Sequence, residues 1–343
     1  MIAPSPEPAA PLLALDNLEV SFAIRSPVLR RVLMRVDAVA GVDLEVAPGR
    51  TLGVVGESGC GKSTMARAIV GLERPTGGAI RFAGEAIGNA DARRRRLLAR
   101  DIQMIFQDPF ASLNPRKTVA QIIGEVWDVH PDLTPAAGRE REIARLMERV
   151  GLGPDMAGRF PHQFSGGQRQ RIGIARAIAL RPRLIVCDEP VSALDVSVQA
   201  QTLNLLAELQ QEYGLAYLFI AHDLAVVRHI SDALAVMYLG RIVETGPVEA
   251  IYRRPAHPYS IALLSAIPVP RPWAVQRPPR IVLQGDVPTP LKPPSGCRFH
   301  TRCFMARERC RHEDPALRPV AGRKVACHFA EEALARTAPE AAP

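Results

Sequence analysis

The feature that most constrains this chain is a glycine-rich segment that joins an apolar run to a helical pattern. After Thr51–Val55 comes Gly56-Glu57-Ser58-Gly59-Cys60-Gly61-Lys62-Ser63-Thr64, and residues 65–72 have helical periodicity. The pattern G-x-x-x-x-G-K-[ST] between a strand and a helix predicts a phosphate-binding loop, whose backbone N–H groups and helix N-terminus face the phosphates. A chance glycine-rich turn is the alternative. Lys62 then reaches the β and γ oxygens and Ser63 can ligate Mg²⁺, so the sequence predicts an ATP-and-Mg²⁺ site.

Not every residue of this loop is expected to matter equally. Glu57 and Cys60 stand at variable positions of the pattern, so no specific role is expected for their side chains. The loop residues predicted to line the nucleotide site are Gly56, Ser58, Gly59, Cys60, Gly61, Lys62, Ser63 and Thr64.

Two adjacent carboxylates follow a second apolar run. Leu184–Cys187 leads into Asp188 and Glu189, and ligands of open α/β sheets bind at the carboxyl edge of such strands. Asp188 is therefore a candidate for the Mg²⁺ shell, and Glu189 for the general base that polarises the attacking water. The alternative is a solvated acidic pair in a turn.

Short apolar runs alternate with helical patterns along the chain, which predicts an α/β fold. Because the runs are apolar on both faces, we expect a mostly parallel sheet covered on both sides. The predicted strands are Leu52–Val55, Ile102–Phe106, Leu184–Cys187 and Ala216–Ala221, and the predicted helices are Arg93–Arg100, Ala136–Val150, Gln168–Leu180 and Ser197–Tyr213.

Composition narrows the class of protein. The 343 residues suffice for about two folding units. No stretch has the ~18 apolar residues of a membrane span, and the Pro/Ala-rich residues 1–12, expected to form a flexible tail, lack the basic start of an export signal. The net charge of +8 allows an anionic partner but does not choose between nucleic acid and a membrane surface.

A third motif resembles a known family. Phe164-Ser165-Gly166-Gly167-Gln168-Arg169 is similar to the signature of ABC-transporter ATPases, about twenty residues before the Asp188-Glu189 pair. Ser165 and Gln168 also have the S-x-x-Q spacing of a capping box, which would leave helix N–H groups free to meet an anion. The resemblance implies a P-loop NTPase fold with an ABC-type, RecA-like core.

Other motifs of this family match in order. Gln107 resembles the Q-loop, Ser192–Asp195 the D-loop with Asp195, and His222 the switch histidine, which makes Glu189, His222 and Gln107 the catalytic candidates. Phe22 is the candidate for stacking on adenine, although an insertion at Ala23–Asp37 follows it and a core position is the alternative.

The resemblance also implies an assembly. Two ATPase subunits, identical or sister chains, pack head to tail, so that Ser165, Gly166, Gly167 and Gln168 of one contact the ATP of the other. Residues 13–255 would form the ATPase domain, with an inserted helical subdomain at about 108–165, and the groove near Gln107 would receive a coupling helix from a membrane subunit. Two transmembrane permease subunits are the expected membrane partners. The protein is expected to be peripheral, on the cytoplasmic face of the bacterial inner membrane. No direct contact with nucleic acid is expected.

Further stretches resemble the ATPase subunits of oligopeptide and dipeptide importers, which work with an extracytoplasmic solute-binding protein. They are Phe106–Arg116, Asp188–Val198 and His257-Pro258-Tyr259. Importers of nickel, glutathione or another small solute share this branch, and a soluble ABC ATPase acting on nucleic acid or ribosomes, or a nucleotide-binding scaffold without turnover, is the more distant alternative.

The last part of the chain is rich in cysteine. Residues 256–330 would form a small extension with a Pro-rich linker, and 331–343 a tail. Cys297, Cys303, Cys310 and Cys327 lack the C-x₂-C spacing of common zinc sites, and in the peptide-importer branch such a quartet resembles the ligands of a [4Fe–4S] cluster. Zn²⁺ and free buried thiols remain alternatives.

Overall fold

The computed structural model describes residues 10–25, 32–108, 112–133, 136–267, 280–286 and 288–337. Its centre is an eight-stranded sheet in the order β11-β12-β10-β9-β3-β8-β7-β6, in which the run from β9 to β6 is parallel. The parallel strands are β9 (Ala233–Tyr238), β3 (Thr51–Val55), β8 (Ala216–Ala221), β7 (Leu184–Asp188) and β6 (Ile102–Ile105). The predicted α/β fold with a mostly parallel sheet is confirmed for this part of the molecule.

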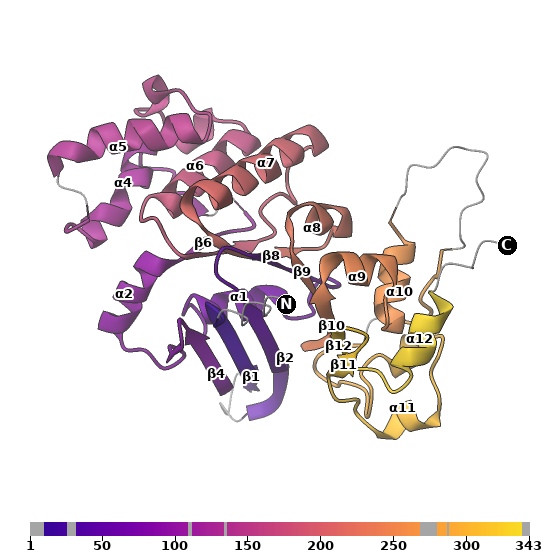
Figure 1. Cartoon of the computed structure of the whole chain (residues 1–343). Coiled ribbons are helices and arrows are strands. Elements are labelled where there is room, and N and C mark those ends of the chain that lie inside the picture. Colours follow the sequence, from indigo (N-terminus) through magenta and orange to yellow (C-terminus); the bar gives the residue numbers. More distant parts are fainter. Residues whose placement is uncertain are drawn as a thin grey trace, which may run out of the picture.

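The parallel strands are buried because both of their faces are covered. Every residue of β3, β7 and β8 is buried, in agreement with their continuous apolar runs. Figure 1 shows α6 and α7 on one side of this sheet and α1 with the strands β1, β2 and β4 on the other. The covering helices are α1 (Lys62–Ile69), α2 (Ala92–Asp101), α6 (Gly166–Ile178), α7 (Val196–Tyr213) and α8 (Leu224–Ile230).

A second, antiparallel sheet was not predicted. It has the order β2-β1-β4-β5 and consists of β1 (Leu13–Arg25), β2 (Val32–Val46), β4 (Gly77–Phe82) and β5 (Glu85–Ala86). Residues 32–37, part of the expected insertion after Phe22, instead belong to β2, since β-branched and apolar residues continue the pairing with β1. Strand alternation that is partly polar gives a weaker signal than a buried run, which is why this sheet was missed.

Helices fill the segment between β6 and α6. They are α4 (Val119–Val129), α5 (Ala136–Arg149) and the short turns Pro154–Met156 and Pro161–Gln163. A capping box starts α4: the Thr118 hydroxyl accepts from the Gln121 N–H, and the Gln121 side chain accepts from the Thr118 N–H. In Figure 1 these helices lie together above the sheet, next to α6.

The C-terminal extension joins the main sheet. After β10 (Arg241–Pro247) come α9 (Val248–Arg253), α10 (Pro258–Ser265), α11 (Glu308–His312), β11 (Arg318–Val320), β12 (Arg323–Val325) and α12 (Ala330–Arg336). β12 pairs with β10, although the two strands are about eighty residues apart and no local sequence pattern predicts their contact. Residues 268–279 and 287 of the predicted Pro-rich linker lie outside the described residues. The helix α12 occupies the start of the segment expected to be a tail, because Ala330 and Ala333 are buried.

A buried ion pair fixes this junction. The carboxylate of Glu244 on β10 is fully buried and accepts hydrogen bonds from the backbone N–H groups of Ala256 and His257, and Arg323 of β12 lies 3.4 Å away. Burial raises the pKa of Glu244. None of the helices in the described ranges is long and apolar enough to cross a bilayer.

Candidate nucleotide site

The loop between β3 and α1 has the shape that an anion site needs. Gly59 and Gly61 have φ values of 77° and 107°, a region that L side chains rarely adopt. A Cβ on Gly61 would also lie 2.0 Å from the carbonyl oxygen of Ala38 on β2, so only glycine fits there. Since α1 begins at Lys62, the unpaired N–H groups of its first turn line the loop.

Lys62 is held inside the loop. Its side chain is 4% exposed, and its ammonium donates to the carbonyl oxygens of Gly56 at 2.7 Å and Glu57 at 3.0 Å. These loop carbonyls occupy the donors that phosphate oxygens would take. The positive charge of Lys62 therefore already lies where the phosphates of the nucleotide are expected.

The end of β7 meets the start of α1. The Ser63 hydroxyl donates to the Asp188 carboxylate at 2.9 Å, which joins two of the predicted site residues from segments 125 positions apart. Asp188 is 3% exposed, and burial is the main cause of its raised pKa, followed by the opposing Ser63 hydrogen bond. A hydroxyl and a carboxylate oxygen side by side are ligand types that Mg²⁺ accepts.

Three of the predicted catalytic residues converge on one oxygen. The Glu189 Oε2 accepts from the side-chain amide of Gln107 at 3.0 Å and lies 3.2 Å from His222 Nδ1. Glu189 has φ 47°, a strained value for a non-glycine residue, and its N–H donates to the carbonyl of Ile220 on β8. The contacts with Gln107 and His222 hold the carboxylate, so this glutamate is positioned rather than freely solvated.

The remaining predicted residues lie in two other places. Phe22 on β1 is 40% exposed, and its partner in the sheet is Val36, two residues before the Ala38 that abuts the loop. Its exposure argues against the core alternative. An accessible aromatic ring thus lies on β1, the neighbour of the strand β2 whose Ala38 contacts the phosphate loop.

The signature forms the predicted cap. The Ser165 hydroxyl accepts from the Gln168 N–H and the Gln168 side-chain oxygen accepts from the Ser165 N–H, which confirms the capping box. A Cβ on Gly167 would lie 2.5 Å from Val198 of α7, so this glycine lets α6 approach the helix that Asp195 begins. Ser165 and Asp195 are exposed, and Val196 is 82% exposed, an open apolar side chain beside the signature.

A groove opens beside the site. It has a volume of about 870 Å³ and lies between the core and the inserted helices. Its walls include Arg67, Gln103, Gln107, Lys117, Glu125 and Asp188. Gln107 and Asp188 therefore face both the groove and the nucleotide site.

One contact of the loop was not anticipated. The carboxylate of Glu57, at a variable position of the motif, accepts two hydrogen bonds from Arg302 of the extension, at 2.8 and 2.9 Å. The Glu57 N–H donates to the Tyr259 hydroxyl at 3.0 Å. No sequence signal pairs residues 245 positions apart, and the motif gives position 57 no weight.

The four cysteines of the extension line one small cavity of about 10 Å³ together with His257, His300 and His328. Burial raises the pKa of Cys303 to about 12 and those of Cys297 and Cys327 to about 11. Across the described ranges, no group of three or more His, Cys, Asp or Glu side chains could hold a metal ion as placed. As placed, the quartet does not form an assembled metal site, because the space between the cysteines fits about one water molecule.

Comparison with known proteins agrees with the motifs. The family model described as "ABC transporter" matches residues 39–192, and the model described as "Oligopeptide/dipeptide transporter, C-terminal region" matches residues 243–310. The chain is 51% identical to the oligopeptide transport ATP-binding protein AppF of Bacillus subtilis over 93% of this chain and 97% of that protein. It is 52% identical to the di/tripeptide transport ATP-binding protein DppF of Pseudomonas aeruginosa over 88% and 92%, respectively.

A relative from a further organism and a solved structure give the same result. Identity to the oligopeptide transport ATP-binding protein OppF of Salmonella typhimurium is 53% over 92% of this chain and 95% of that protein. A dimeric post-hydrolysis structure of the ATP-binding cassette MJ0796 with ADP and Pi superposes with a TM-score of 0.62 at 26% identity, covering 69% of this chain and 98% of that one. The chain therefore belongs to the ABC-transporter ATPases, in the family of oligopeptide/dipeptide transport ATP-binding proteins.

Proposed function

We propose that this chain is the motor subunit of a membrane importer that binds and hydrolyses ATP at an interface shared with a second ATPase subunit, and so drives uptake of di- and oligopeptides. The observation that carries the proposal is the convergence of Ser63, Asp188 and the Gln107-Glu189-His222 group beside the phosphate loop. The names of the relatives support the peptide class of substrate. Importers of nickel, glutathione or another small solute are the second candidates.

Each residue of the site has a role in this mechanism. Lys62 exchanges its bonds to the loop carbonyls for phosphate oxygens, and the N–H groups of the first turn of α1 bind the same phosphates. Ser63 and Asp188 are the residues that would hold Mg²⁺, which supplies charge neutralisation when bound with ATP. Glu189 accepts the proton of the attacking water, while Gln107 and His222 orient its carboxylate.

The other half of the site is proposed to come from a partner. The exposed Ser165, the open helix N-terminus that follows it, and the exposed Asp195 and Val196 fit contact with the ATP of a second subunit, identical or sister. The dimeric state of the MJ0796 cassette supports this arrangement. Phe22 is proposed to stack on the adenine because its ring is accessible on β1, next to the strand that contacts the loop.

The groove is the proposed docking place of the permease. Its volume of about 870 Å³ suits an inserted helix turn, and Gln107 in its wall also contacts Glu189, which links docking to hydrolysis. We propose two transmembrane permease subunits as the partners, an extracytoplasmic solute-binding protein upstream of them, and a peripheral position on the cytoplasmic face of the bacterial inner membrane.

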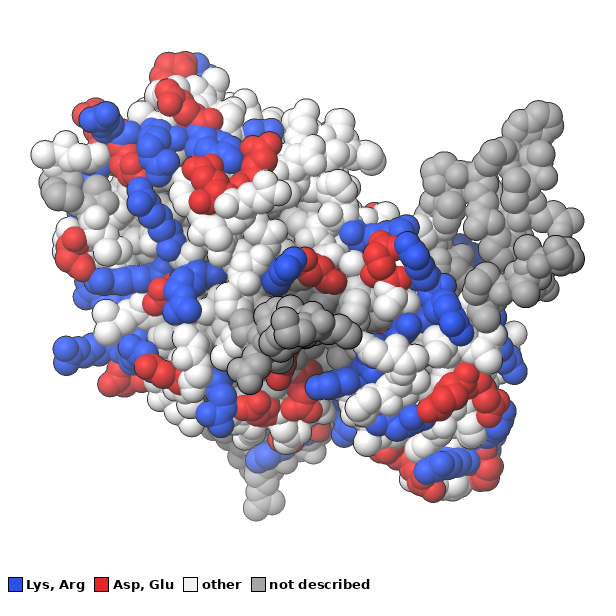
Figure 2. Space-filling view, viewed as in Figure 1, with Lys and Arg blue, Asp and Glu red and all other residues white. Residues whose placement is uncertain are grey.

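A role on nucleic acid has less support. On the face shown in Figure 2, basic and acidic side chains intermingle over the helical insertion and the extension. Nucleic-acid binders gather their basic side chains into a continuous patch or stripe. The net charge of +8 therefore needs no nucleic-acid partner.

We further propose that Cys297, Cys303, Cys310 and Cys327 bind a thiolate-ligated metal centre, with [4Fe–4S] ahead of Zn²⁺. Their position around one cavity supports this, as do the backbone N–H groups of Met305 and Phe329, which donate to the sulfurs of Cys303 and Cys327 at 3.4 Å. Such bonds stabilise the thiolate, which is the form that binds metal. The cavity would have to open for a cluster.

Replacement of Asp188 by asparagine should keep the nucleotide-free chain at least as stable as wild type but remove its stabilisation by Mg·ATP. Because its pKa is raised above 3.8, the folded chain holds this proton more tightly than the unfolded chain, so stability falls as pH rises through the raised pKa and stays reduced at pH 7. We expect nucleotide-free Asp188→Asn to melt at or above the wild-type temperature at pH 7 and to lose the stabilisation by Mg·ATP. A melting temperature several degrees lower, or a retained Mg·ATP shift, contradicts this role.

Replacement of the proposed base traps the ATP state. Turnover of Glu189→Gln should fall ~10²–10⁴-fold, while an ATP-bound dimer accumulates on size-exclusion chromatography. Lys62→Ala should bind no ATP and form no such dimer. Glu208→Gln, which changes a surface glutamate paired with Arg149, is the matched control and should resemble wild type. Near-wild-type turnover of Glu189→Gln rules out its role as base.

The cysteine proposal is tested by anaerobic purification. The full chain should be brown with about four irons per molecule. Serine at all four positions of the quartet should abolish the colour, whereas Cys187→Ala, at a buried cysteine of β7, should keep it. A folded, colourless chain with zinc selects the Zn²⁺ alternative, and one without either metal leaves free thiols.

A further inference from the structure

Glu57, the second residue of the phosphate loop, is held by hydrogen bonds from several directions. The carbonyl oxygen of Glu57 accepts from Lys62, its N–H donates to Tyr259 of α10, and its carboxylate accepts from Arg302. Two of these three partners belong to the C-terminal extension. The ATPase core thus supplies the loop, but the extension holds its second residue in place.

The Arg302–Glu57 pair is sheltered from water. The Arg302 side chain is 8% exposed and the Glu57 side chain 25% exposed, and one guanidinium nitrogen bonds both carboxylate oxygens. Charge pairs at this depth are screened little by salt, and loss of one partner leaves an uncompensated charge. The pair is therefore unlike the exposed ion pairs on the surface of the extension, such as Arg318–Glu331.

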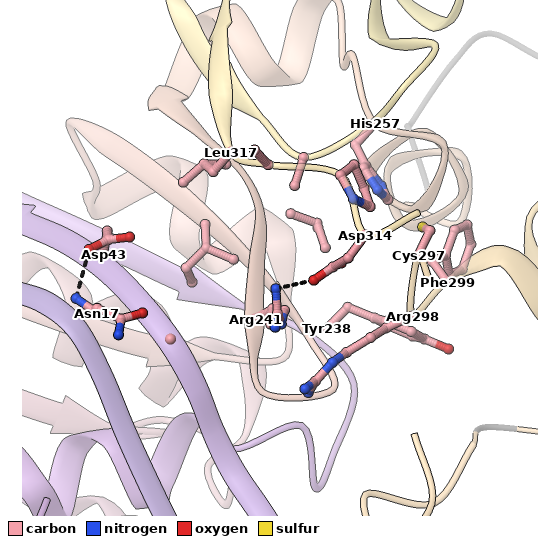
Figure 3. Close-up of a pocket in the computed structure, with 16 residues that line it drawn as sticks. Asn17, Asp43, Tyr238, Arg241, His257, Cys297, Arg298, Phe299, Asp314 and Leu317 are labelled. Carbon is pink, nitrogen blue, oxygen red and sulfur yellow. Dashed lines mark hydrogen bonds and ion pairs between the residues drawn. The ribbon is translucent and has the colours of Figure 1, made fainter. Parts of the chain in front are cut away.

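An aromatic group keeps Arg302 in position. Arg302 ends the short turn His300–Arg302, which follows the fully buried Phe299. The Phe299 ring packs at 5.1 Å from Tyr238 of β9 and at 5.3 Å from Tyr259. Figure 3 shows Tyr238, Phe299 and Cys297 together on the wall of a cavity of about 210 Å³ at this junction. The turn thus rests on the end of β9, next to the loop.

Electrostatics gives this contact a consequence for ATP. A carboxylate at the second position of a phosphate loop sets a negative charge beside an anionic ligand, which weakens binding unless it is neutralised. Arg302 is the cation that bonds Glu57. Its removal would expose the site to that charge and release the Glu57 side chain.

We propose that Arg302 is a positioning residue of the nucleotide site, which neutralises Glu57 and, with Tyr259, holds the loop in the form that receives ATP. The inference rests on the proposed ATP site and deepens it, since it makes the extension a part of that site. Because the pair does not touch the reacting atoms, its loss affects ATP affinity and KM rather than kcat.

The test is a double-mutant cycle on the full chain, with the Kd for Mg·ATP as readout. Arg302→Ala should raise Kd about tenfold, the change that roughly 1.4 kcal/mol produces. Glu57→Gln, which keeps the shape and removes the charge, should raise it by less than about threefold. The double variant should bind as Glu57→Gln does, because the harmful charge is gone. A merely structural role predicts no such recovery.

Two further variants complete the design. Arg302→Lys keeps the charge and guards against loss of fold, and should be intermediate. Arg241→Ala breaks another contact between core and extension, to Asp314, and should leave Kd unchanged. In the assembled transporter, Arg302→Ala should raise KM for ATP with kcat within about twofold of wild type.

Two results would overturn the inference. One is a Kd of Arg302→Ala within about twofold of wild type while Lys62→Ala abolishes binding. The other is a double variant that binds as weakly as Arg302→Ala or more weakly. If the wild-type chain itself binds no Mg·ATP, the proposed function fails instead, so the two failures are distinguishable.

Discussion

The structure depends on one requirement, that three parallel strands end at the same edge of a buried sheet. β3 delivers the phosphate loop, β7 delivers Asp188 and Glu189, and β8 leads to His222. A site for a polyanion needs cations, N–H donors and carboxylates in one small volume, and these groups repel or lose hydration unless the fold holds them. The hydrogen bond from Ser63 to Asp188 joins the first two strand ends, and the bonds of Glu189 to Gln107 and His222 join the others.

Much of this arrangement was predictable because its signals are local. The strand, glycine loop and helix around Lys62, the buried runs of β7 and β8, and the capping box at Ser165 are each set by neighbours in sequence, and the structure confirms them. The antiparallel β1–β2 sheet, the pairing of β12 with β10 and the Arg302–Glu57 contact were missed. They join distant segments, and their residues have no pattern that identifies a partner.

The position of Glu57 shows the limit of motif reasoning. A position that varies within a family has no role common to all members, but its side chain can still have a role in one particular chain. Here the carboxylate binds an extension that also contains the cysteine quartet, and Arg302 immediately precedes Cys303. The extension is thus tied to the ATPase core by Glu244 on one side and by the phosphate loop on the other. The extension therefore helps to hold the nucleotide site and is not a loosely attached segment.

The exposed parts of the site complete this account. Ser165, Asp195 and Val196 form an open face, and the groove beside Gln107 opens toward a second surface. The most direct test of the central claim is the ATPase rate of this chain assembled with its membrane subunits, measured with di-, tri- and longer peptides, nickel and glutathione, each delivered by the matching binding protein. The account predicts stimulation by peptides. Stimulation by nickel or glutathione alone would contradict the peptide assignment, and stimulation by none of these solutes but by DNA or ribosomes would contradict the role in transport.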